Sequence, residues 1–239
     1  SYLKNYINTL VLEGRVQQAT NEIKQNLSDD SSNFFEAHLL IALDSLKKKD
    51  FRKSKEHLQR SYEFINNDKF SLIVAETLKQ YLDVFEENKI SKIENKFGNF
   101  SLINLAFQRC YLNDENTKTY FKQLFNTQNS GDHSRYIFFY LNYLIENNEY
   151  EEVKNISRNL DYLNSSLLIS QGKKWIEEEK LEEFKKIFSC NSSNDITSEF
   201  FFLVSNLYSS QENYEKSNFY LNISHYLNPK FKFNLSLLA

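Results

Sequence analysis

Residues 200–227 have the sequence FFFLVSNLYSSQENYEKSNFYLNISHYL, in which two apolar segments flank the polar tripeptide at 211–213. Apolar residues recur at helical spacing on both sides of this tripeptide, so each segment predicts a helix. The same layout occurs at 136–160, where Asn147, Asn148 and Glu149 separate the two apolar segments. Such short polar joints indicate pairs of helices connected by turns.

The same boundary recurs along the whole chain. A large residue follows a polar stretch and opens an amphipathic segment at seven positions: Val16, Phe51, Ile90, Thr117, Tyr150, Leu181 and Tyr214. The spacings are 35, 39, 27, 33, 31 and 33 residues, with an average of 33. In a helical chain, a period of this length predicts stacked helix pairs.

The composition favours an all-α fold. The 239 residues include only four Gly and one Pro, which leaves few residues for the tight turns of sandwiches and barrels. Hydrophobic residues make up 41% of the chain and charged residues 26%, enough for a packed core and a solvated surface. We predict one continuous unit over residues 1–239, because a repeat array buries its core between neighbouring repeats.

The positions within each period resemble the tetratricopeptide repeat, in which small residues let two helices approach and large residues fill the groove between pairs. The last repeat fits best, with Ser205 small in its first helix and Tyr214, Ser217, Leu221, Ser224 and Pro229 in its second. The first two repeats fit through Gly14, Val16, Ala19 and Ile23, and through Ala42, Phe51, Ser54 and Leu58; the fifth fits only through Gly172, Trp175 and Leu181. Larger residues occupy the small position of the second helix in the middle of the chain: Ile93, Tyr120, Val153 and Phe184.

The resemblance implies a degenerate, right-handed α-solenoid of about six to seven antiparallel helix pairs, similar to repeat proteins of bacteria. The expected repeats cover approximately 1–32, 33–67, 68–99, 100–131, 132–164, 165–195 and 196–229, with the start of a further repeat at 230–239. A solenoid normally ends in a polar capping repeat, which neither end of this chain resembles. We therefore expect a fragment of a longer repeat protein.

Charge and hydropathy narrow the expected partners. The formal net charge is −3, which does not favour nucleic acid as a partner, and the Lys47, Lys48 and Lys49 run is interpreted as helix-end cations. No apolar stretch approaches the roughly 18 residues of a membrane span. We expect a soluble chain without membrane insertion, and the sequence leaves open a cytoplasmic or periplasmic location.

No sequence pattern predicts catalysis or the binding of a metal or cofactor. The four histidines lack metal-ligand spacing, and no glycine-rich phosphate loop or nucleophile motif occurs, so we predict no catalytic, cofactor-binding or metal-binding residues and no enzyme. The two cysteines, Cys110 and Cys190, lie 80 residues apart without a CxxC motif. They are expected to be buried small hydrophobic residues rather than a disulfide framework.

The resemblance implies a scaffold or adaptor whose first helices line a concave groove for a peptide or helix of a partner protein. The expected groove residues are Lys4, Asn8, Leu43, Phe138, Phe139, Asn142, Lys173, Phe202 and Asn206. The alternative for Phe138 and Phe202 is ordinary core. A terminal-carboxylate clamp is not expected, because Leu40 stands where the clamp needs Asn. The alternative function is a recruiting arm of a larger enzyme whose catalytic domain lies outside these residues.

Overall fold

The computed structural model describes residues 2–26, 30–65, 68–90, 99–126, 135–160 and 166–238. These residues contain thirteen α-helices, three 3₁₀-helices and no strand, which confirms the predicted all-α class. They belong to two compact units. Unit 1 comprises residues 1–91 and 193–239, and unit 2 comprises residues 92–192.

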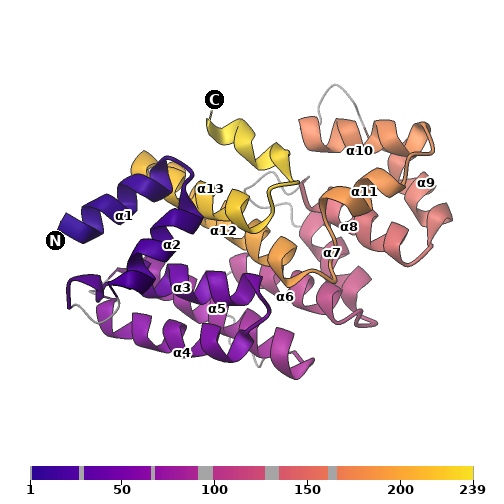
Figure 1. Ribbon diagram of the computed structural model, residues 1–239. Helices are drawn as coiled ribbons and strands as arrows, with labels where there is room; N and C mark the ends of the chain where they lie inside the picture. Colours follow the sequence, from indigo (N-terminus) through magenta and orange to yellow (C-terminus); the bar gives the residue numbers. More distant parts are fainter. Residues whose placement is uncertain are drawn as a thin grey trace. The chain divides into compact units, whose positions relative to one another are not determined.

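Unit 1 contains helices from both ends of the sequence. They are α1 (Tyr2–Leu12), α2 (Val16–Gln25), η1 (Asp30–Ser32), α3 (Phe35–Lys47), α4 (Phe51–Ser61), η2 (Tyr62–Phe64), α5 (Lys69–Glu87), α12 (Ser193–Ser209), α13 (Tyr214–Leu227) and η3 (Lys232–Leu238). Helix α12 contacts α3 and α5, and α13 contacts α1 and α2 (Figure 1). In an open solenoid each repeat contacts only its neighbours, whereas unit 1 joins helix pairs that are far apart in the sequence.

Hydrogen bonds fix α13 against the N-terminal helices. Lys47 Nζ donates to the carbonyl of Tyr226 over 2.7 Å, and the Tyr226 hydroxyl donates to Asp44 Oδ1 over 3.0 Å. Burial opposes the ionisation of Asp44, but hydrogen bonds from Lys24, Lys48 and Tyr226 outweigh this effect and lower its pKa to about 2. The buried carboxylate therefore remains charged at neutral pH and holds both parts of unit 1 together.

Unit 2 is built around aromatic side chains. Its helices are α6 (Asn99–Tyr111), α7 (Thr117–Asn126), α8 (Arg135–Glu146), α9 (Tyr150–Arg158), α10 (Leu167–Glu177) and α11 (Glu182–Ile187). The Phe138 and Phe184 rings stack with centroids 4.9 Å apart, and a Cβ on Gly172 would lie only 3.2 Å from each ring. Glycine at this position therefore allows α10 to approach α8.

The same turn ends the first helix of six pairs. A residue with φ between +49° and +75° occupies the turn at Gly14, Lys49, Asn113, Asn148, Glu179 and Glu212. In every case the next backbone N–H donates to the carbonyl five residues earlier, over 2.7 to 3.0 Å, which is the Schellman arrangement. These turns are separated by 35, 64, 35, 31 and 33 residues, so the local geometry repeats with the period seen in the sequence.

Most of the predicted helix starts are confirmed. Val16, Phe51, Thr117, Tyr150 and Tyr214 open α2, α4, α7, α9 and α13, and Leu181 directly precedes α11. Ile90 opens no described helix: α5 ends at Glu87, and residues 91–98, including Ile93, lie outside the described residues.

Small residues bring paired helices close together, as expected from the repeat pattern. Ser54 Oγ donates to the carbonyl of Ala42 over 2.7 Å, between α4 and α3. The hydroxyl oxygens of Ser205 and Ser217 lie 3.0 Å apart, between α12 and α13. A larger side chain at these positions would push the helices of a pair apart.

Both cysteines are buried, as expected, but the prediction that they form no disulfide is wrong. Cys110 and Cys190 form a disulfide within unit 2, with their Cα atoms 5.5 Å apart. It joins the end of α6 to the segment that follows α11. Spacing along a sequence does not show which cysteines the tertiary fold brings together, and no local motif marks this pair.

No described helix is both long enough and apolar enough to cross a membrane.

Candidate binding groove

Five of the nine residues expected to line a binding groove are core residues in this structure. Leu43, Phe138, Phe139, Asn142 and Phe202 are all buried, with exposed fractions of 6% or less. The Asn142 side chain donates to the carbonyl of Phe188 over 2.9 Å, and this hydrogen bond lies in the interior of unit 2. These side chains present no surface to a partner. At helical spacing an aromatic side chain in the core and one facing a groove form the same sequence pattern.

Two further expected residues, Lys4 and Asn8, line a small cavity of about 210 Å³ in unit 1 together with Glu36 and Lys216. Lys4 pairs with Glu36 at 3.3 Å, and Lys216 pairs with Asp68 at 2.9 Å. The cations of this cavity are therefore already matched by carboxylates.

The last two expected residues lie in different units. Lys173, on α10 in unit 2, donates to the carbonyl of Leu160 over 2.6 Å, and Asn206 is half-buried on α12 in unit 1. Within unit 1, Asn206 does not line the small cavity that contains Lys4 and Asn8.

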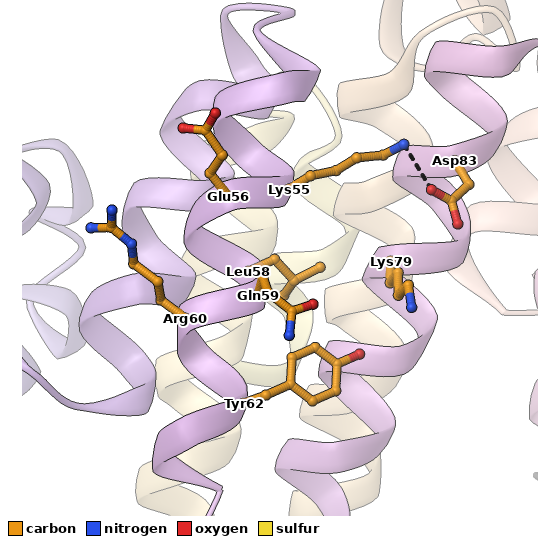
Figure 2. A pocket seen from close by; sticks show the side chains of 8 residues that line it. All are labelled: Lys55, Glu56, Leu58, Gln59, Arg60, Tyr62, Lys79 and Asp83. Carbon is orange, nitrogen blue, oxygen red and sulfur yellow. Dashed lines mark ion pairs between the residues drawn. The ribbon is translucent and has the colours of Figure 1, made fainter.

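A larger cavity of about 510 Å³ opens between α4 and α5 in unit 1 (Figure 2). We call it the α4–α5 groove; its lining residues are Lys55, Glu56, Leu58, Gln59, Arg60, Tyr62, Lys79 and Asp83. Its volume lies within the roughly 300–1,000 Å³ that is usual for ligand sites.

The local sequence explains why the groove has defined walls. Asp50 caps α4 by accepting from the backbone N–H of Lys53 over 3.1 Å, and Asp68 caps α5 by accepting from that of Phe70 over 3.0 Å. Leu58 and other apolar or small residues of α4 are buried. Its long polar side chains Arg52, Lys53, Glu56, Gln59 and Arg60 lie on its outer surface.

Side chains connect the two walls at two separate points. Lys55 of α4 binds Asp83 at 2.8 Å and also Glu86 of α5. Burial acts to lower the pKa of Lys55, but its hydrogen bonds to these carboxylates outweigh that effect and raise it. The Tyr62 hydroxyl donates to Glu76 over 3.0 Å, and burial together with this carboxylate raises the pKa of Tyr62. Both groups keep their protons at neutral pH and hold the walls in place.

Two cations of the groove are not neutralised in this way. Arg60 and Lys79 are exposed, and neither forms an ion pair with a carboxylate in the described part of the chain. Figure 2 shows Gln59, Tyr62 and Lys79 facing the gap between the helices, whereas the Arg60 guanidinium turns away from α5. Lys79 therefore belongs to the interior of the groove and Arg60 to its rim.

The sequence of this region contains a local excess of basic residues, which the net charge of the whole chain conceals. Residues 47–60 contain seven Lys or Arg and two Asp or Glu, whereas the whole chain has 29 and 32. Lys47 and Lys48 lie at the C-terminal end of α3, as predicted; Lys47 also donates to the Tyr226 carbonyl, and Lys48 pairs with Asp44. A local count of charge would have drawn attention to the rest of α4.

Within the described residues, no three His, Cys, Asp or Glu side chains form a group that could hold a metal ion. Comparisons of the chain with protein-family models, curated proteins and solved structures find no match. The tetratricopeptide resemblance stays a prediction from the sequence.

Proposed function

We propose that this chain is a non-enzymatic interaction scaffold whose α4–α5 groove receives a segment of a partner protein. The observation that carries the proposal is an open groove with connected walls and two cations, Arg60 and Lys79, that pair with no carboxylate among the described residues. Walls that are already fixed reduce the conformational entropy lost on binding.

The chemistry of the lining suits recognition. Gln59 offers an amide that can both donate to and accept from a peptide backbone, while the half-buried Tyr62 ring adds apolar surface. Of the two lining carboxylates, Asp83 is held by Lys55, and Glu56 pairs with Arg52 at 3.3 Å outside the lining. The groove thus combines shape, apolar contact and hydrogen bonding.

Selection of peptides tests this proposal. Random 16-residue peptides displayed on phage are selected on the purified chain and then measured against variants that fill the groove, Gln59→Trp and Lys79→Trp. Both positions are exposed, so the larger side chain should not disturb the core. Lys230→Trp is the matched control, because Lys230 is also exposed in unit 1 but does not line the groove.

We expect the selected peptides to lose binding to both groove variants and to keep it with the control. Peptides that bind all four proteins equally would show that the groove is not the site.

A further inference from the structure

We propose that the segment bound in the α4–α5 groove is an acidic peptide whose carboxylates contact Lys79 and Arg60. This inference rests on the proposed function and names the chemistry of the partner. The exposed surface of α4 continues the positive charge beyond the groove itself.

The arrangement of charge along α4 supports an extended contact. Lys53 and Arg60 are exposed, form no ion pair with a described carboxylate and lie seven residues apart, so they are separated by about 10 Å along the helix. Arg52 pairs with Glu56 and is partly neutralised. A short acidic segment that crosses the rim can therefore contact Arg60 and still reach Lys79.

Carboxylates interleaved with these cations favour a peptide over a phosphate polymer or an anionic membrane. Glu56 lies between Lys53 and Arg60 on α4, and Asp83 and Glu86 line or flank the groove on α5. A continuous row of phosphates would face these carboxylates as well as the cations. A peptide can place single carboxylates opposite Lys79 and Arg60 and use its backbone to bond Gln59.

The test uses three fluorescein-labelled peptides of twelve residues that alternate Leu with Glu, Gln or Lys. Fluorescence anisotropy gives the Kd of each peptide for the native chain and for the double variant Arg60→Glu with Lys79→Glu. The control is Lys230→Glu with Lys232→Glu, which changes the net charge equally at exposed positions outside the groove lining. Circular dichroism checks the fold, and Arg60→Gln with Lys79→Gln replaces the double reversal if that variant unfolds.

We expect only the Glu peptide to bind tightly, with a Kd at least tenfold weaker in the groove variant and within threefold of native in the control. If the Gln peptide binds as tightly and Gln59→Trp abolishes it, the groove is a binding site but its acidic preference is wrong. Equal weakening in the groove and control variants would overturn the inference, because it would show diffuse charge attraction. Groove-dependent binding of phosphatidylserine vesicles or of oligo(dT), without peptide binding, would overturn it in favour of a membrane or nucleic-acid surface.

A separate observation in unit 2 concerns the compartment in which the protein folds. We infer that the chain matures in an oxidising compartment. Its only two cysteines are joined to each other, and each is 1% exposed. Disulfides are rare in the reducing cytosol and persist in secreted, periplasmic and cell-surface proteins.

The surrounding contacts show that the disulfide is part of the packing of unit 2. It fixes the non-helical segment at 188–190, where Asn142 donates to the Phe188 carbonyl. Glu146 hydrogen-bonds to Ser189 and to the backbone of Cys190 in the same segment. Helix α8 and the disulfide thus hold one short segment from two sides.

Mass spectrometry of the protein from its native source tests this inference. Cells are lysed directly into denaturing urea with N-ethylmaleimide, so that buried thiols are also trapped. We expect a linked peptide pair containing Cys110 and Cys190. Recovery of both cysteines as N-ethylmaleimide adducts would overturn the inference.

Discussion

Removing the disulfide should destabilise unit 2 selectively. The change is Cys110→Ala with Cys190→Ala, which opens a loop that spans 80 residues and covers most of the unit. In the chain-entropy treatment, closure of a loop of this length stabilises the folded state by about 4.5 kcal/mol. Because domains are typically stable by about 5–15 kcal/mol, this loss would leave unit 2 marginally stable.

The single tryptophan makes the effect measurable in one unit. Trp175 lies on α10 in unit 2, with its ring centroid 5.4 Å from that of Phe184 and 6.5 Å from that of Phe138. Urea unfolding followed by tryptophan fluorescence therefore reports on unit 2. The expected result is a transition at much lower urea, with a free energy of unfolding reduced by about 4 kcal/mol.

Reduction provides the internal control. Dithiothreitol in the urea solutions should shift the native chain to the midpoint of the double variant and leave the variant itself unchanged. A change below about 1 kcal/mol in the double variant, or an equal effect of dithiothreitol on both proteins, would refute the role given to the disulfide.

Three further outcomes follow from buried or strained positions. Burial, and then the charge of a neighbouring buried histidine, lowers the pKa of His57 from 6.5 to about 4. Between these two pH values the unfolded chain binds more protons than the folded chain, so the free energy of unfolding of unit 1 should fall by up to about 3 kcal/mol as pH falls from 6.5 towards 4. Urea unfolding followed by circular dichroism should show this loss, and the loss should be smaller in His57→Gln. Gly172→Ala should destabilise unit 2 by about 1 kcal/mol or more by tryptophan fluorescence, because the added Cβ crowds Phe138 and Phe184 despite better helix propensity; stabilisation would contradict the close packing. Glu212→Gly should stabilise unit 1 by about 0.5 kcal/mol and so raise its melting temperature slightly, because φ is +59° at this position and glycine adopts this conformation without strain. A lower melting temperature would contradict this, because it would mean that the Glu side chain stabilises the fold by more than the backbone strain destabilises it.

Local features of the fold could be predicted from the sequence because they depend on neighbouring residues. The polar turn at 211–213 and the bulky Tyr214 identify the start of α13, and the same reasoning places α4 at Phe51. The small residues Ser54 and Ser205 mark close contacts between paired helices. These signs act over a few residues and repeat with the period.

Contacts between distant segments could not be predicted in this way. The contact of α13 with α1, the pairing of Cys110 with Cys190 and the burial of Asn142 depend on how helix pairs meet in three dimensions. Residues Arg60 and Lys79 of the groove belong to different helices, so their separation along the chain conceals their common cavity. The basic composition of 47–60 was the only local sign of that surface.

Hydrogen-exchange mass spectrometry with and without a selected peptide would test the binding site most directly. We expect slower exchange in α4 and α5, around Gln59 and Lys79, with helices α6 to α11 of unit 2 unchanged. Peptide-dependent protection confined to α8 and α10, with α4 and α5 unaffected, would contradict it.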